Sequence, residues 1–192
     1  MVQAKRITES KLPLLYSESR NFDLGKKRKE GKTYIVGNLP YYITSPILFL
    51  LLENRDLFED AILMMQKEVA ERLAADISTK AYGILSVQTQ LMSSVEMLFD
   101  VSPNSFSPPP KVQSSVLRLT FDQPDLECSD KNLKTVVRTA FNQRRKKISN
   151  SLKPVLGDLQ PDGYDFDLRP ENWEPATYAK LTAHLESIGM ME

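Results

Sequence analysis

The sequence is poor in the residues that most metal sites and covalent catalysts need. Its 192 residues include one cysteine, Cys128, and one histidine, His184. A lone cysteine excludes a disulfide within the chain. One histidine gives little support to a serine–histidine triad or to a transition-metal site. We therefore expect no bound metal.

Long apolar runs are lacking too. No stretch of about 18 apolar residues occurs, which would be needed to span a membrane. Residues 1–11 also lack the apolar segment of a secretory signal. With 41% hydrophobic and 26% charged residues, the composition is that of an ordinary globular protein. We expect a cytoplasmic protein with no membrane partner.

An excess of charge of one sign is absent from the chain as a whole, because 25 basic residues balance 25 acidic ones. The balance hides local segregation. Residues 131–153 carry eight basic residues and no acidic one, whereas residues 154–192 carry eight acidic and two basic residues. This pattern suits a protein with one side facing nucleic acid. On charge alone, solvated helix faces explain it equally well.

Apolar runs that alternate with periodic polar segments predict an α/β fold followed by a helical region. We expect strands at residues 33–36, 61–65, 95–101 and 115–121, and helices at residues 47–53, 67–76, 82–93, 131–142, 144–156 and 175–188. Ser45 and Pro46 are expected to start the first helix, with Ser45 as its N-cap. Residues 1–32 are polar and irregular, which indicates loop or partial helix. An acidic linker follows Phe121, so we place a domain boundary near residue 122.

The most informative segment is Asn38-Leu39-Pro40-Tyr41, directly after the first expected strand. The exocyclic amine of adenine is a poor nucleophile because its lone pair is delocalised into the ring. The Asn38 side-chain oxygen and the backbone carbonyl of Leu39 or Pro40 can each accept one N–H, which orients that nitrogen toward a methyl group. Tyr41 offers a face for base stacking. Taken alone, four such residues are more often an ordinary turn.

A second segment, Phe106–Ser114, contains three consecutive prolines and lies between two expected strands. Phe106 can supply a second stacking face for a base, and Lys111 can contact a phosphate. The alternative is a proline-rich loop with a core phenylalanine.

A third segment, Phe141–Lys147, ends in four consecutive cations, Arg144, Arg145, Lys146 and Lys147. We expect them at the start of a helix, where four neighbours cannot all face a core. They form either a solvated helix end or a phosphate-binding face.

Together, five segments resemble the ribosomal RNA adenine dimethyltransferase family in order and approximate spacing. They are Val36–Pro46 (VGNLPYYITSP), Gln66–Leu73 (QKEVAERL), Tyr82-Gly83, Phe106–Ser114 and Phe141–Lys147. The match runs from about residue 33 to about residue 153.

The resemblance implies S-adenosylmethionine-dependent transfer of two methyl groups to each of two adjacent adenosines. These lie in a hairpin near the 3′ end of small-subunit ribosomal RNA, so the implied partners are that RNA and a pre-30S-type particle during ribosome biogenesis. The implied fold is a Rossmann-like methyltransferase domain followed by a small all-helical domain. We assign residues 1–122 to a partial catalytic domain and residues 123–192 to an RNA-binding domain.

The resemblance also implies residue roles. Asn38 and the backbone of Leu39 and Pro40 would hold the target amine, and Asn38 would also touch the methyl donor. Tyr41 and Phe106 would sandwich the adenine. RNA phosphates would meet Lys111, Arg144, Arg145, Lys146 and Lys147.

The sequence departs from the family before Asn38. Only 37 residues precede the motif, fewer than the family has, and they contain no Gly-x-Gly, the loop that would let backbone approach the donor. We expect an incomplete donor site and an apolar edge at the strand before Asn38. The alternatives are a non-catalytic RNA-binding or ribosome-assembly protein, an inactive fragment and, less well supported, a DNA adenine or protein methyltransferase.

Overall fold

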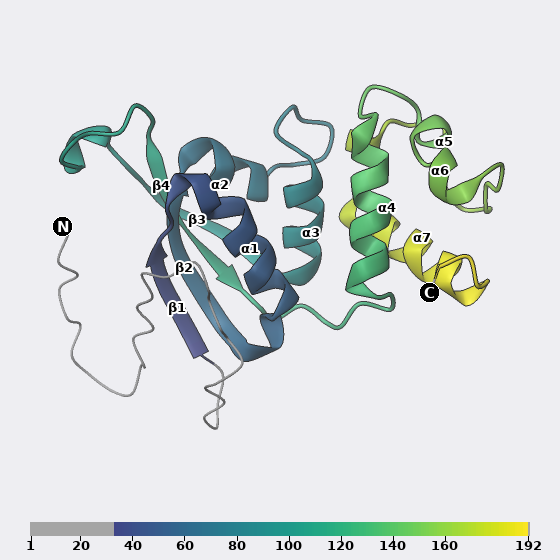
Figure 1. Ribbon diagram of the computed structural model, residues 1–192, viewed down its shortest axis with the longest axis horizontal. Helices are drawn as coiled ribbons and strands as arrows, with labels where there is room; N and C mark the ends of the chain where they lie inside the picture. The colour runs from purple at the N-terminus through teal and green to yellow at the C-terminus, as the bar shows by residue number, and fades with distance from the viewer. Residues whose placement is uncertain (1–32, 192) are drawn as a thin grey trace.

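One mixed sheet forms the first half of the molecule (Figure 1). The computed structural model describes residues 33–191, so the expectation for residues 1–32 lies outside the described part. The strands are β1 (Thr33–Asn38), β2 (Phe58–Gln66), β3 (Ser94–Val101) and β4 (Ser114–Thr120). Their order is β1-β2-β4-β3, with β1 parallel to β2 and with β4 antiparallel to both of its neighbours. The carboxyl ends of β1, β2 and β3 therefore meet the amino end of β4 at one edge.

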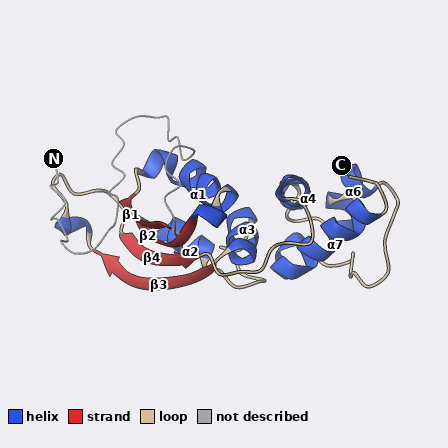
Figure 2. Ribbon diagram, turned by 90° about the horizontal axis from the view of Figure 1, so that it is seen from below, coloured by secondary structure: helices blue, strands red, loops and turns tan. Residues whose placement is uncertain are grey.

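Helices cover one face of this sheet (Figure 2). They are α1 (Thr44–Glu53), α2 (Lys67–Leu73) and α3 (Ile84–Met92). A linker then leads to the helical part, which contains α4 (Asp130–Asn142), α5 (Ile148–Ser151), α6 (Lys153–Leu156) and α7 (Pro175–Ser187). Short 3-10 turns lie at Tyr41–Ile43, Arg55–Leu57, Pro103–Ser105 and Pro170–Asn172. None of the helices in residues 33–191 has the length and apolar character needed to cross a membrane.

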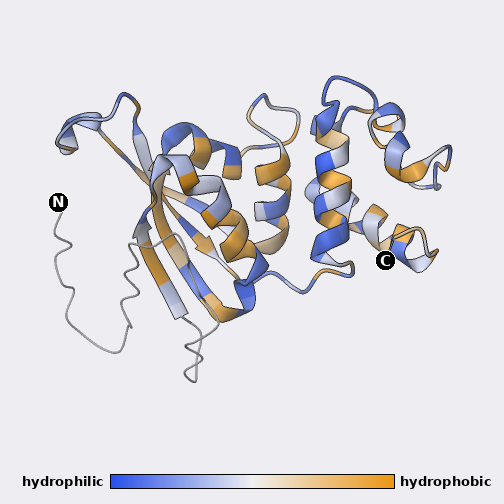
Figure 3. Ribbon diagram, in the orientation of Figure 1, coloured by the Kyte–Doolittle hydropathy of each residue, from blue (hydrophilic) through white to orange (hydrophobic). Residues whose placement is uncertain are grey.

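The core follows from the period-2 alternation of the central strands. In β2, Ala61, Leu63 and Met65 are fully buried, and Leu117 and Leu119 of β4 lie on the same face. Hydrophobic residues concentrate on these strands and on the helices beside them (Figure 3). Each fully buried Leu contributes about 1.5–3 kcal/mol, so the sheet and its helices form a stable platform.

β1 is the edge strand of the described sheet, as expected. Its side chains alternate, and Tyr34 and Val36 point away from the covered face, with exposed fractions of 47% and 74%. The described part of the chain places no helix over that face (Figure 2).

Two expectations about helices were wrong, and the first concerns the start of α1. α1 begins at Thr44 with Ile43 as its N-cap, so Ser45 lies inside the first turn. The reason is that the 3-10 turn Tyr41–Ile43 leads directly into the helix, and Thr44 Oγ1 donates to the Pro40 carbonyl at 3.1 Å.

Residues 144–156 also do not form one helix. Residues 143–147 form a turn, and α5 and α6 follow it as separate short helices. The backbone N–H groups of Ile148 and Ser149 donate to the carbonyls of Leu168 and Phe166. These two N–H groups are therefore not available to donate to carbonyls four residues earlier, as a continuous helix would require. The four cations lie in the turn directly before α5, and Lys147 is the N-cap of that short helix.

A set of contacts that we call the joint fastens the helical part to the loop between α2 and α3. Arg144 Nε donates to Glu171 Oε2 at 2.5 Å, and its Nη1 and Nη2 donate to the carbonyls of Lys80 and Thr79, both at 2.9 Å. The Ser78 N–H donates to the Glu171 carbonyl at 2.7 Å. All three nitrogens of the Arg144 guanidinium are thus engaged within the molecule.

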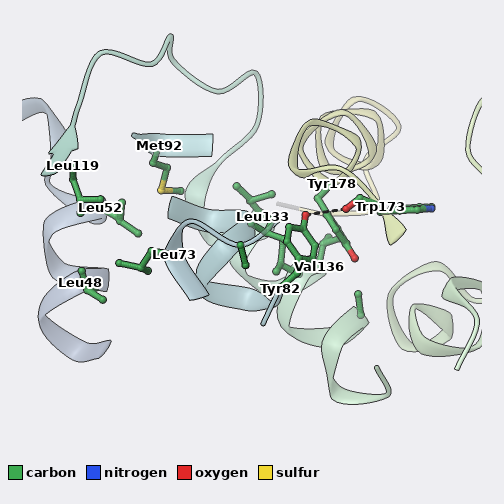
Figure 4. Close-up of a cluster of buried hydrophobic side chains, with 14 of the residues drawn as sticks. Leu48, Leu52, Leu73, Tyr82, Met92, Leu119, Leu133, Val136, Trp173 and Tyr178 are labelled. Carbon is green, nitrogen blue, oxygen red and sulfur yellow. Dashed lines mark hydrogen bonds between the residues drawn. The ribbon is translucent and has the colours of Figure 1, made fainter. Parts of the chain in front are cut away.

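Aromatic side chains complete the joint (Figure 4). The Tyr82 hydroxyl donates to the Trp173 carbonyl at 2.9 Å, and burial raises the pKa of Tyr82 well above its usual value. The Phe141 ring lies 6.2 Å from the Tyr82 ring and 6.0 Å from the Tyr178 ring. Buried residues from both halves form one continuous hydrophobic cluster. The helical part is consequently held in a defined position on α3.

Arg144→Ala should lower the free energy of unfolding by about 2 kcal/mol, because it removes hydrogen bonds from a charged group to one carboxylate and two carbonyls. Denaturant unfolding followed by circular dichroism measures this. Arg144→Lys should restore only part of the loss, since an ammonium cannot reproduce the planar fork. The matched control is Arg145→Ala, which should change stability by less than about 0.5 kcal/mol. Equal effects at the two positions would contradict a structural role for Arg144.

Candidate functional site

The site begins where β1 ends. Asn38 pairs in register with Met64 of β2, and one residue later the Leu39 N–H donates to the Met64 carbonyl at 2.9 Å. The Leu39 side chain is buried, whereas Asn38 is exposed. The chain therefore stays attached to β2 through Leu39 before it turns. The Asn38 amide is left facing solvent at the carboxyl edge of the sheet.

The structure distinguishes between the two backbone carbonyls considered as the second acceptor. The Pro40 oxygen already accepts two hydrogen bonds, from the Ile43 N–H and from Thr44 Oγ1, both at 3.1 Å. A carbonyl oxygen has two lone pairs, so that oxygen is fully used. Leu39 is left as the better second acceptor beside Asn38.

Tyr41 connects the turn after β1 to the start of β4. Its hydroxyl lies 2.7 Å from Ser114 Oγ, 73 residues further along the chain. The neighbouring Gln113 carbonyl accepts the Lys67 N–H at 2.9 Å. The structure thus brings together three of the segments singled out in the sequence, Val36–Pro46, Gln66–Leu73 and Phe106–Ser114.

Phe106 and Lys111 lie in the loop between β3 and β4. Phe106 is half-buried directly after the 3-10 turn Pro103–Ser105, and its N–H donates to the Pro103 carbonyl at 3.1 Å. Among the described aromatic pairs, none joins Phe106 to Tyr41. Lys111 is exposed.

An ion pair anchors that loop, and sequence reasoning did not identify it. Lys67 Nζ lies 2.6 Å from Asp100 Oδ2, and Ser115 Oγ donates to Asp100 Oδ1 at 2.6 Å. The hydrogen bond from Lys67 holds the pKa of the Asp100 carboxyl below its usual value, and the bond from Ser115 lowers it further. Residues 67 and 100 come together only through the pairing of β2, β4 and β3, which no local pattern reveals.

The four expected RNA-binding cations divide into two groups. Arg144 belongs to the joint, and Lys147 Nζ lies 2.8 Å from Asp167 Oδ1. Arg145 and Lys146 are exposed, and the described residues offer neither of them a partner. The turn that carries them, residues 143–147, is called the basic turn below. It lies on the same side of the molecule as the β3–β4 loop, at the top of Figure 1.

Comparison with known proteins identifies relatives across most of the chain. The family model described as ribosomal RNA adenine dimethylase matches residues 3–165. Ribosomal RNA small subunit methyltransferase A of Bacteroides thetaiotaomicron is 48% identical over 161 residues, which cover 82% of this chain and 60% of that protein. The protein of the same name from Pseudomonas aeruginosa is 43% identical over 185 residues, covering 94% of this chain and 69% of its own length.

Solved structures agree with these matches. A dimethyladenosine transferase from Plasmodium falciparum aligns with a TM-score of 0.73 and 25% identity, over 88% of this chain and 72% of that one. The 23S rRNA methyltransferase ErmE shares the fold, with a TM-score of 0.52 and 24% identity over 82% of this chain and 68% of that one. The sheet and its helices are therefore those of a Rossmann-like methyltransferase domain, with a helical part after it. The chain spans about 60% of the length of the first of its curated relatives. It belongs to the ribosomal RNA adenine dimethylase family.

Proposed function

We propose that this chain carries the adenine-binding part of an enzyme that dimethylates two adjacent adenosines. The adenosines lie in a hairpin near the 3′ end of small-subunit ribosomal RNA. The observation that carries the proposal is the pair of acceptors at the end of β1, the Asn38 side chain and the Leu39 carbonyl. Family membership supports the substrate class. The partner would be a pre-30S-type particle during cytoplasmic ribosome biogenesis.

The two acceptors act by position. Each accepts one N–H of the target amine, so the nitrogen becomes more tetrahedral and its lone pair points away from both oxygens. Leu39 is held by Met64, and the bonds of Pro40 to Ile43 and Thr44 fix the turn behind it. The acceptors are therefore oriented before the base arrives. After transfer the nitrogen loses a proton to water, because amide oxygens are too weakly basic to keep it.

S-adenosylmethionine supplies an electrophilic methyl group on a sulfonium when bound. Asn38, exposed at the carboxyl edge of the sheet, is the described residue that we place beside the donor. We propose that this chain binds the donor weakly by itself, since no Gly-x-Gly precedes Asn38. A second candidate function is a non-catalytic RNA-binding protein, and the exposed cations Arg145 and Lys146 support it.

The target base must leave its stack to reach Asn38. Tyr41 and Phe106 would then hold it between their rings, with the Tyr41 ring orientation set by the Ser114 hydroxyl. Arg145 and Lys146 would contact RNA phosphates, together with Lys147 in the same turn and Lys111 in the separate β3–β4 loop. Arg144 would act indirectly, by holding the basic turn in place.

Asn38→Ala should lower kcat about 100-fold or more while the Kd for RNA stays nearly constant, because it removes one preorganised acceptor. Methyl transfer to small-subunit RNA measures this. Calorimetric titration of the same samples with S-adenosylmethionine separates lost donor binding from lost transfer. A pure loss of RNA affinity would show that Asn38 only shapes the turn. A folded wild-type chain that binds RNA but neither binds the donor nor transfers methyl groups would favour the non-catalytic candidate.

Tyr41→Ala should reduce kcat/KM about 10- to 100-fold, since stacking of a base on an aromatic ring contributes about 1–3 kcal/mol. Tyr41→Phe is the matched control. It keeps the ring and loses only the hydrogen bond to Ser114, so most of the activity should remain. Equal losses in the two variants would show that the hydroxyl, and not the ring, matters.

Arg145→Ala combined with Lys146→Ala should weaken RNA binding and make it less dependent on salt, with a slope of log K against log salt smaller by about 1.4–1.8 for two phosphate contacts. Fluorescence anisotropy of a labelled hairpin measures both quantities. The control is Lys180→Ala on α7, an exposed cation outside the basic turn. An unchanged slope in the double variant would remove the basic turn from the RNA interface.

A further inference from the structure

Tyr42 is an aromatic residue that the proposed reaction leaves without a role. Its exposed fraction is 80%, higher than that of any other large hydrophobic side chain among the described residues. No aromatic pair or hydrogen bond joins its ring or hydroxyl to another residue of the described part. Single exposed apolar side chains are common on protein surfaces. This one, however, directly follows the Asn38–Tyr41 segment and lies beside the proposed site of the target base.

The backbone of Tyr42 is fixed by the same turn that fixes the acceptors. Tyr42 is the middle residue of the 3-10 turn Tyr41–Ile43. The Ile43 N–H and Thr44 Oγ1 both donate to the Pro40 carbonyl at 3.1 Å, so these two bonds close the chain around Tyr42. A tyrosine has only two side-chain torsions, so a ring on a fixed backbone loses little conformational entropy when a ligand covers it.

Tyr41 and Tyr42 point in different directions from this turn. A 3-10 helix has three residues per turn, so consecutive side chains diverge by about 120°. The Tyr41 hydroxyl lies 2.7 Å from Ser114 Oγ, whereas the Tyr42 ring faces solvent. A base that has left its stack to reach Asn38 also points away from the next base in the strand. The two rings therefore have the divergent arrangement that two adjacent, unstacked bases require.

We infer that Tyr42 forms a second stacking site, which binds the adenine next to the one held at Asn38. The inference rests on the proposed function, because it requires the target base to lie at Asn38 and Tyr41. Proteins commonly hold unpaired RNA by stacking successive bases on aromatic side chains. Residues 33–52 contain no charged side chain. The second site would therefore recognise the face of a base and not a phosphate.

Stacking also allows this site to hold an adenine that is already methylated. Each methyl group replaces one N–H of the amine, so dimethyladenine has no N–H left to donate to Asn38 or Leu39. A site built to accept hydrogen bonds rejects a ligand that lacks the donors. The face of the methylated base still stacks on a ring. Tyr42 would thus retain the finished adenine while the second adenosine occupies the acceptors, which couples the two modifications.

Binding of labelled small-subunit RNA hairpins to the 192-residue chain, followed by fluorescence anisotropy, tests the inference. Tyr42→Ala should raise the Kd of a hairpin with both adenosines about fivefold or more, because one stacked base is lost. The salt slope should stay constant, since the ring carries no charge. On hairpins in which either adenosine is abasic, Tyr42→Ala should bind like the wild type, because the remaining adenine occupies the site at Asn38.

A hairpin with one adenosine already dimethylated tests the retention of the finished base. Tyr42→Ala should weaken binding of this hairpin as much as binding of the unmodified one. An effect that vanishes on the dimethylated hairpin would contradict retention at Tyr42.

Two variants serve as matched controls. Tyr42→Phe keeps the ring and should bind every hairpin like the wild type. Tyr34→Ala removes an exposed ring near the other end of β1 and should leave the Kd unchanged. The melting temperature of Tyr42→Ala should not fall, because the ring that it removes is exposed. A general folding defect would weaken binding of all the hairpins alike, and that outcome overturns the inference.

Tyr41→Ala, measured in parallel, separates this inference from the proposed function. It should weaken binding of the intact hairpin and of both abasic hairpins. If it does so while Tyr42→Ala changes nothing, the second stacking site does not exist and the proposed function stands. If the effect of Tyr42→Ala persists on both abasic hairpins, the ring contacts something other than the neighbouring adenine, and the inference fails. A Tyr41→Ala variant that binds all the hairpins like the wild type would overturn the stacking of the target base and this inference together.

Discussion

The hydrogen bond from the Leu39 N–H to the Met64 carbonyl sets the position of Asn38 and Leu39 on the sheet. It carries the pairing of β1 with β2 one residue beyond Asn38, so the turn cannot begin earlier. β2 also fixes the start of β4, because Gln66 pairs with Ser114, the residue whose hydroxyl contacts the Tyr41 hydroxyl. One central strand therefore positions the acceptors, the stacking ring and the start of β4. A shift of β2 by one residue would separate them.

The joint extends this order to the helical part. Arg144, Glu171 and the loop before α3 fasten the basic turn to the sheet half, and the Tyr82, Phe141 and Tyr178 rings fill the space behind it. The two halves share one hydrophobic cluster. Arg144, which the sequence alone assigned to RNA binding, thus has a structural role. The contacts of Arg144 also position the exposed cations next to it, Arg145 and Lys146.

Much of the fold could be predicted from sequence because it follows local rules. β-Branched and apolar runs marked all four strands, and apolar periodicity marked α3, α4 and α7. The error at residues 144–156 arose because segment 166–168 takes up the N–H groups of Ile148 and Ser149, a long-range event. The Lys67–Asp100 pair was missed for the same reason. The roles of Asn38 and Phe106, and the boundary near residue 122, remain predictions.

The segregation of charge along the sequence does not persist in space. The acidic segment folds back on the turn of residues 143–147, where Glu171 pairs with Arg144 and Asp167 pairs with Lys147. A polyanion that approached this turn would meet Arg145 and Lys146 as cations without a carboxylate partner in the described part of the chain. The carboxylates beside them would repel further phosphates, so the attractive surface is narrow and restricts where along a strand a contact can form.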